Sequence, residues 1–156
     1  MIILGVQFLG AQIRTQAFQT IADNNSSHYG VGISAQHSLY GNQRFLPGAS
    51  IGVNYEFNAF DDHDVISVPI ELILRQYLYG RHSCCGGGYV EAMGGAKFTP
   101  FVRNARSSDK PSTMPIASIG LGYRTGMSYD ISLYYGANFE KNKVGSIVGI
   151  KLGYNL

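Results

Sequence analysis

Apolar and polar side chains alternate with a period of two residues along most of this chain. In residues 128–139 the odd positions carry Tyr129, Ile131, Leu133, Tyr135, Ala137 and Phe139. The even positions carry Ser128, Asp130, Ser132, Tyr134, Gly136 and Asn138. Successive side chains of a β-strand point to opposite faces of a sheet, so this period predicts strands rather than amphipathic helices.

The same division recurs in six further segments, which are residues 29–35, 49–59, 64–79, 87–98, 117–123 and 144–156. A weaker segment at residues 11–20 precedes them, which makes eight predicted strands. Pro69 lies inside the predicted strand 64–79, where a proline removes a hydrogen-bond donor from the sheet. We therefore expect a bulge or a local break at Pro69.

The composition indicates one domain and excludes several classes of protein. The 156 residues are 45% hydrophobic, which is too apolar for a disordered tail, and their net charge of +2 favours neither nucleic acid nor an acidic substrate. No apolar run reaches the ~18 residues of a membrane-spanning helix. We expect residues 12–156 to form a single domain. Residues 1–11 are apolar and resemble the remnant of a signal peptide, the alternative being a first strand or an ordered apolar arm.

The two faces of the predicted strands differ in a way that suits a membrane. The polar face is built mainly of Gly and Ser, which fit the narrow interior of an eight-stranded barrel. The other face carries aliphatic residues and Tyr, and in the seven clear strands it has no Asp, Glu, Lys or Arg. A face of this kind suits contact with lipid. We predict an all-β fold, an eight-stranded antiparallel up-and-down transmembrane β-barrel.

The connections between the predicted strands fall into two groups. The group expected to form tight turns is 41–46, 80–86 and 124–127, and the group expected to form longer loops is 22–28, 61–64, 101–114 and 140–143. Membrane barrels of bacteria have short periplasmic turns and longer external loops. With eight strands, both ends of the chain lie on the turn side, which we predict to be periplasmic.

These features resemble the small eight-stranded outer-membrane β-barrel family, which includes the OmpA membrane domain and OmpX. The resemblance covers residues 11–156 and rests on the two-residue repeat, the glycine-rich faces and the last strand, Val144–Leu156. Residues 66–70 and 75–78 look like the Bacteroidetes-type variant of this family. The resemblance implies a monomer in the bacterial outer membrane that contacts membrane lipids and lipopolysaccharide. It also implies an unidentified surface ligand, and neither a cofactor nor nucleic acid.

Charged residues on the inward face form the main candidate site. The acidic members are Glu56, Glu71, Glu91 and Asp130, and the basic members are Arg75, Lys97, Arg124 and Lys151, with Arg14 as a further candidate. An eight-stranded barrel is only wide enough for side chains, so we expect these charges to pair across strands and close the lumen. Glu71 and Arg75 are too far apart on one strand to pair directly. We expect their partners on neighbouring strands, with Glu91 or Lys97 the first candidates.

Three other clusters are candidates for binding. Cys84 and Cys85 with His82 suggest a metal or redox site, but three soft ligands within four residues do not make a tetrahedral cage, and a turn with incidental thiols is the alternative. The run 61–64 could hold a divalent cation, although it lacks the spacing of an EF-hand loop and also suits a solvated hairpin tip. The third cluster lies in the external loops and could contact anionic lipopolysaccharide, the alternative being ordinary polar loop composition. Its basic residues are Arg103, Arg106 and Lys110, with Lys141 and Lys143.

Two alternative functions remain open from the sequence. An outer-membrane enzyme that deacylates lipid A would need a Ser, His and acid constellation near the outer leaflet. His37 lies on a lipid-facing register near the periplasmic end, and His28 and His63 are expected in loops without a defensible Ser and acid partner. We therefore predict no catalytic residues. A soluble lipocalin-like ligand barrel would instead place the aliphatic face inside a cavity.

Overall fold

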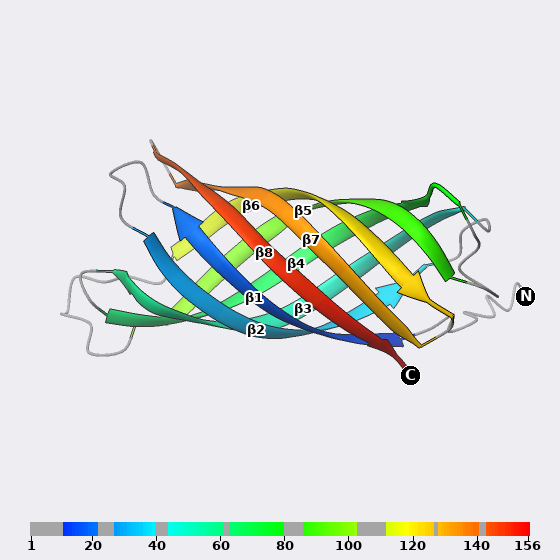
Figure 1. Cartoon of the computed structure of the whole chain (residues 1–156). Helices are drawn as coiled ribbons and strands as arrows, with labels where there is room; N and C mark the ends of the chain where they lie inside the picture. The colour runs from blue at the N-terminus through cyan, green and yellow to red at the C-terminus, as the bar shows by residue number, and fades with distance from the viewer. Residues whose placement is uncertain are drawn as a thin grey trace, which may run out of the picture.

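The computed structural model describes residues 11–21, 27–39, 44–60, 63–79, 86–102, 112–126, 128–140 and 143–156. These residues form eight strands: β1 (Ala11–Ile21), β2 (Ser27–Ser38), β3 (Phe45–Phe60), β4 (His63–Tyr77), β5 (Gly86–Val102), β6 (Ser112–Thr125), β7 (Tyr129–Glu140) and β8 (Lys143–Asn155). Each strand pairs antiparallel with the next, and β1 also pairs with β8 to close the barrel (Figure 1). The predicted all-β, eight-stranded barrel is confirmed. Among the described residues, no helix is long and apolar enough to cross a membrane.

The strands are strongly inclined to the barrel axis (Figure 1). Following register partners once round the barrel from Asn155 leads back to β8 at Gly145, ten residues earlier. The path runs through Gln12, Gln36, Ser50, Glu71, Gly95, Ile116 and Asn138. A closed sheet with such a stagger must tilt its strands, typically by ~35–45°. Residues that are distant in sequence therefore share one level of the lumen.

Both ends of the described chain lie at the same end of the barrel. The amide of Leu156 donates a hydrogen bond of 3.0 Å to the carbonyl of Ala11. We call this end the terminal end and the opposite end, where β1 stops at Ile21, the far end. Three connections lie at the terminal end and four at the far end.

The outer surface of the barrel is apolar, and the inside is charged. Large hydrophobic side chains such as Leu72, Leu121 and Leu133 are more than 60% exposed. Buried charged side chains are Arg14, Glu56, Arg75, Glu91, Lys97, Asp130 and Lys151. A soluble protein shows the opposite distribution, because charged groups are almost never fully buried there. This inversion is expected of a barrel whose outer face meets hydrocarbon.

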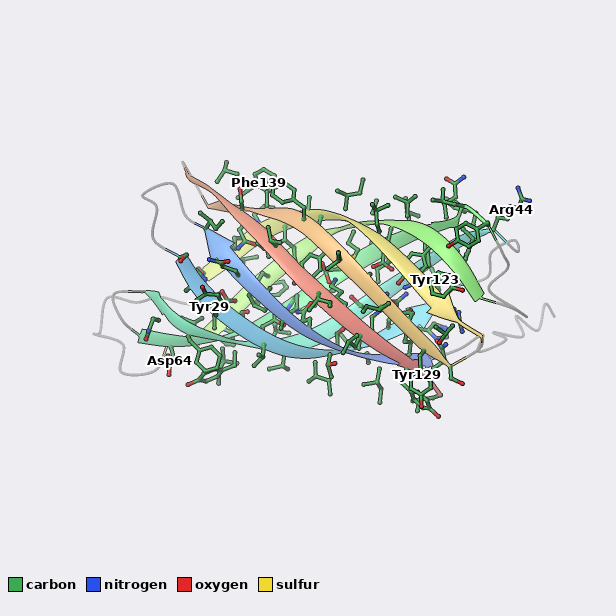
Figure 2. The ribbon with its side chains drawn as sticks, viewed as in Figure 1. Tyr29, Arg44, Asp64, Tyr123, Tyr129 and Phe139 are labelled. Carbon is green, nitrogen blue, oxygen red and sulfur yellow. The ribbon has the colours of Figure 1, made fainter. Side chains whose placement is uncertain are left out.

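Aromatic side chains ring the outer surface near both ends. Near the terminal end, Tyr129 lies against Tyr154 with ring centroids 5.2 Å apart; near the far end, Tyr55 lies against Phe57 at 5.0 Å. Figure 2 shows Tyr123 and Tyr129 at one end and Tyr29 and Phe139 at the other. Tyr129 and Phe139 on β7 are ten positions apart, which corresponds to about 24 Å of barrel height at the usual rise and tilt. This height matches the apolar band of a membrane barrel, about 25 Å.

Inward glycines make room for large inward side chains on the neighbouring strand. Gly149 is the direct partner of Tyr134, and a Cβ at Gly149 would lie 2.6 Å from atoms of the tyrosine ring. Gly30 stands in the same relation to Phe18 on β1. The glycines of the polar face therefore leave space inside the barrel for aromatic side chains from neighbouring strands.

Two irregularities occur in the sheet, both toward the far end. The β3–β4 register shifts between Glu56 and Phe60, where Asn58 adopts a left-handed backbone with φ of 52°. The β4–β5 register shifts between Ile66 and Val68 of β4. The sequence predicts a bulge or local break at Pro69, and the observed shift ends at Val68, one residue before it. Pro69 itself is still aligned with Lys97 on β5.

The expected division into tight turns and long loops is wrong. At the far end only two residues separate β3 from β4 and β7 from β8, whereas at the terminal end eight residues separate β4 from β5. The reason is that the ladder of β3, β4 and β5 continues past the aromatic ring at the far end. Backbone hydrogen bonds do not need an apolar pattern, so the alternation of side chains could not mark these strand ends. His28 and His63, expected in loops, lie within β2 and β4.

Candidate functional site: the lumen

Four charged side chains form a closed ring in the terminal half of the lumen. Arg14 of β1 binds Glu91 at 2.9 Å and Asp130 at 3.1 Å. Arg75 of β4 binds the other oxygens of the same two carboxylates, at 2.6 Å to Glu91 and 3.2 Å to Asp130. Each arginine thus bridges both acids, and each acid bridges both arginines. We call this arrangement the ion quartet.

The ion quartet is enclosed by polar and aromatic side chains. Gln12 donates a hydrogen bond of 2.5 Å to Asp130, and Arg14 donates one of 3.1 Å to the hydroxyl of Tyr89. The guanidinium carbon of Arg75 lies 4.1 Å from the centre of the Tyr89 ring. Charge-assisted hydrogen bonds of this kind are strong in a medium of low dielectric constant. The terminal half of the lumen is therefore filled by mutually neutralising groups.

A looser pair lies in the middle of the lumen. The ammonium of Lys151 on β8 is 4.0 Å from the carboxylate of Glu71 on β4, and it lies 3.0 Å from the sulfur of Met93. It also lies 4.6 Å from the centre of the Tyr134 ring. Glu71 accepts a long hydrogen bond of 3.4 Å from Ser50. Lys151 is therefore held by weak, soft contacts rather than by a tight ion pair.

A third cluster, toward the far end, is centred on Glu56 of β3. Its carboxylate accepts hydrogen bonds from Lys97 at 3.0 and 3.2 Å and from Ser67 at 2.7 Å. The imidazole of His28 lies 3.2 Å from the same carboxylate. Glu56 is thus surrounded on three sides by groups from β2, β4 and β5.

The structure brings together most of the charges that the sequence assigned to the lumen. Arg75 and Glu91 are direct partners on β4 and β5, as the sequence suggested. The partner of Glu71 differs from the expectation: Glu71 faces Lys151 of β8, not Glu91 or Lys97 on the next strand. The contact runs across the lumen instead of along the sheet. Arg124 of β6 is the register partner of Asp130 on β7 and donates a hydrogen bond of 3.4 Å to Tyr77.

Sequence reasoning missed the members of these clusters that are not Asp, Glu, Lys or Arg. Gln12, Ser67 and His28 contact the inward acids, and Tyr89 contacts both arginines of the quartet. The aromatic members did carry a signal. A tyrosine on a strand face otherwise made of Gly and Ser marks a side chain that fills the lumen.

Little free volume lies among the described side chains of the lumen. Phe18, Ile73, Met93 and Tyr134 form a buried apolar cluster, with Ile147 packed against it. A cavity of about 40 Å³ lies beside Phe18 and Tyr134, between the Glu56 cluster and the Lys151–Glu71 pair. A single water needs roughly 10–15 Å³ of such volume. The described lumen therefore holds room for a few waters and no continuous pore.

His28 is not placed as the base of a catalytic relay to Ser67. In a nucleophile–histidine–acid triad the imidazole lies between the hydroxyl and the carboxylate. Here the carboxylate of Glu56 lies between Ser67 and His28. The hydroxyl of Ser67 therefore donates its hydrogen bond to the carboxylate of Glu56 rather than to the imidazole of His28.

Several candidate residues lie outside the described part of the chain. These are the signal-like residues 1–10, the pair Cys84 and Cys85 with His82, Asp61 and Asp62, and the loop cations Arg103, Arg106, Lys110 and Lys141. Ala11, the last residue of the signal-like segment, is the first of β1 and pairs with His37. Among the described residues, no group of three or more His, Cys, Asp or Glu is placed to hold a metal ion.

The architecture is that of small membrane-spanning barrels with a filled lumen. Comparison with solved structures finds this fold in the N-terminal β-barrel domain of Pseudomonas aeruginosa OprF, with a TM-score of 0.57 and 14% identity over 95% of this chain and 100% of that one. Neisserial surface protein A matches with a TM-score of 0.61 and 13% identity over 94% of this chain and 96% of that one. Ail, the attachment invasion locus protein of Yersinia pestis, matches with a TM-score of 0.55 and 12% identity over 94% and 97%.

These neighbours are small outer-membrane β-barrels, and the chain shares their fold. No protein-family model matches the chain, and no curated protein matches it.

Proposed function

We propose that this chain is a monomeric integral protein of a Gram-negative outer membrane, with a closed lumen, whose external loops form its working surface. The observation that carries the proposal is the combination of an apolar outer belt with a lumen filled by paired charges. The belt suits lipid, and the paired charges of the described lumen support a barrel without a path for solutes. The likeness to outer-membrane barrels supports the same location.

The far end is proposed as the external side. It carries the 103–111 connection, the longest at that end, with the basic residues Arg103, Arg106 and Lys110. Cationic loops suit an anionic partner such as lipopolysaccharide. Ail has been solved in complex with the heparin analogue sucrose octasulfate, which is a strongly anionic ligand. We propose an anionic surface ligand for this chain and no catalytic role.

Membrane fractionation and proteolysis test this proposal. The protein is expected in the outer-membrane fraction and soluble only with detergent. On intact cells, protease is expected to cut within residues 101–114 and to leave residues 80–86 intact. Cleavage confined to 80–86 would invert the orientation, and a folded protein in plain buffer without detergent would contradict the membrane location.

Binding to an anionic partner is tested separately. Purified protein in detergent is expected to bind immobilised lipopolysaccharide at low salt and to release it as salt rises. A variant with Arg103, Arg106 and Lys110 changed to Gln is expected to lose most of this binding. A matched control changes Arg44, a cation near the terminal end of β3, to Gln and is expected to keep it (Figure 2). Equal binding by both variants would contradict the assignment to this loop.

A further inference from the structure

Two shallow grooves lie on the outer surface of the barrel and meet on β1. The first has a volume of about 420 Å³ and runs over β7, β8 and β1, with Tyr129, Tyr154 and Leu152 among its walls. The second has a volume of about 350 Å³ and continues across β2 and β3 to Val68 of β4. Both are lined by Ile13, so together they form one diagonal path, which we call the outer groove.

The outer groove contains a short side chain between two long ones. On β2, Ala35 is the register partner of Ile13 on one side and of Ile51 on the other. Ala35 is exposed, and the two isoleucines are 40% and 54% exposed. Lipid is as apolar as isoleucine, so an acyl chain gains nothing from the hydrophobic effect here and is held by close packing. A recess between two aliphatic walls offers such a chain more contact atoms than the convex surface beside it.

The two ends of the outer groove differ in polarity, as the two ends of a lipid do. One end lies in the aromatic ring near the terminal end of the barrel, where Tyr129 packs against Tyr154 (Figure 2). Thr125 adds a hydroxyl there. Tyrosines are enriched at the level of lipid headgroups, because their rings are apolar and their hydroxyls are polar. The other end is aliphatic and is lined by Val53 and Val68.

The height of the outer groove matches the depth of one leaflet. The path of register partners advances ten residues in eight strand steps, which corresponds to about 24 Å of barrel height. The groove takes five of these steps, from β7 to β4, and therefore rises by about 15 Å toward the far end. The hydrocarbon core of a bilayer is about 30 Å thick. An acyl chain that starts at the aromatic ring would therefore reach the middle of the membrane along this groove.

We propose that the outer groove binds one acyl chain of a glycerophospholipid from the leaflet at the terminal end, with the headgroup beside Tyr129 and Tyr154. The inference rests on the membrane location in the proposed function and goes beyond it, because it assigns a binding site to the outer wall. In the proposed orientation the terminal end is periplasmic, and the periplasmic leaflet of an outer membrane consists of phospholipids. The chains of lipopolysaccharide enter from the far end and would meet the aliphatic end of the groove first.

Native mass spectrometry of the protein extracted from outer membranes in a mild detergent tests the site. The folded protein is expected to carry an adduct with the mass of one phospholipid. Ala35→Phe fills the recess between Ile13 and Ile51 and is expected to lose this adduct. A folded parent protein without an adduct, an adduct with the mass of lipid A, or an adduct that survives Ala35→Phe would overturn the proposal.

Ala92 of β5 provides the matched control. It is also an exposed alanine between two long side chains, since its register partners are Leu74 and Ile119, and it lies outside both grooves. Three strand steps from Ala35 to Ala96 rise by about 9 Å, and the four residues back to Ala92 fall by about 10 Å, so Ala92 and Ala35 lie at about the same height. Ala92→Phe is expected to keep the adduct, and loss of the adduct in both variants would contradict the assignment to the groove.

Fluorescence quenching gives an independent answer. The chain has no tryptophan, so Leu152→Trp in the groove and Leu74→Trp beside Ala92 each introduce a single reporter. The two leucines are 52% and 50% exposed. Phosphatidylcholine with brominated chains is added to each folded variant in detergent. Quenching in Leu152→Trp is expected to saturate at a single equivalent of lipid, whereas quenching in Leu74→Trp is expected to grow gradually with excess lipid.

The outcomes separate this inference from the proposed function. Equal quenching curves for the two variants in a protein that needs detergent would overturn the lipid site and leave the membrane location intact. A protein that stays folded in plain buffer would overturn both.

Discussion

Single inward residues of this barrel are constrained by the side chains that lie over them. Gly149 is covered by the ring of Tyr134, whereas Gly94 on the outer face of β5 has no atom closer than 4.0 Å to the position of a Cβ. The two glycines are both in strand interiors, so they share the same backbone cost. They differ in what a side chain would meet, which makes them a matched pair.

Gly149→Val is expected to destabilise the barrel by about 1–3 kcal/mol, because the new methyl groups must push Tyr134 out of a filled lumen. Gly94→Val, which points into the outer apolar layer, is expected to change stability by less than about 0.5 kcal/mol. Urea unfolding in lipid vesicles, followed by the difference in gel mobility between folded and unfolded protein, measures both. Equal losses for the two variants would contradict the account of the inward glycines.

The charged residues of the lumen also differ in how much each one contributes to the stability of the barrel. Glu91 is fully buried and pairs with both arginines, so Glu91→Gln leaves them with Asp130 as the one remaining acid of the quartet and is expected to cost about 3–5 kcal/mol. Glu71→Gln removes a partner at 4.0 Å whose side chain is 14% exposed, and a smaller loss is expected. Arg75→Ala is expected to resemble Glu91→Gln. The same urea assay ranks the stabilities of the three variants. A loss of stability for Glu71→Gln as large as that for Glu91→Gln would be evidence against the ion quartet as the main stabilising cluster of the lumen.

At the scale of the strands, the β3–β4 pair carries a bulge that depends on one asparagine. Asn58 has a φ of 52°, its amide donates a hydrogen bond of 3.2 Å to Asp64, and Asp64 also accepts the hydroxyl of Tyr55. Asparagine and glycine tolerate this left-handed backbone, whereas a β-branched residue does not. The bulge thus joins the end of β3 to the start of β4 beyond the aromatic ring.

Asn58→Val is expected to destabilise the protein by about 1–2 kcal/mol, and Asn58→Gly is expected to be close to neutral. The change lies on the outer rim, so the lumen contacts of Glu56 should persist in both variants. Thermal unfolding of the detergent-solubilised protein, followed by circular dichroism, gives the comparison. If Val were tolerated as well as Gly at this position, the left-handed conformation would not be needed for the pairing of β3 with β4.

The sequence predicts the middle of every strand better than the ends. Side chains must alternate where one face of a strand meets lipid and the other meets the lumen. The predicted strand 128–139 therefore agrees with β7 to within one residue at each end. Beyond the apolar band that constraint disappears, and the continuation of β5 to Val102 left no signal. The β3 strand likewise begins at Phe45, inside a segment expected to be a turn.

The lumen contacts likewise divide into those that the sequence could predict and those that it could not. The Arg75–Glu91 pair follows from facing positions on adjacent strands, which the alternation could bring close. The contacts of Asp130 with Arg14 and of Lys151 with Glu71 run across the barrel. They depend on the ten-residue stagger of the closed sheet, which no local pattern encodes. Which charges face inward was therefore predictable, but which of them meet was not.

On the scale of the whole molecule, the filled lumen predicts a barrel that does not conduct. Among the described residues, the ion quartet and the tyrosine beside it occupy the terminal half, the apolar cluster lies in the middle, and the cavity beside that cluster has a volume of only about 40 Å³. Pure protein in a planar bilayer is expected to show no steady current above that of the bare membrane, and a large porin inserted in the same bilayer serves as the control. Because the quartet neutralises itself, high salt screens little of it, so raising the salt concentration should not open a path. A stable open-pore current from the unaltered protein would show that the charges line water, and the closed-lumen function would then have to be replaced by that of a channel.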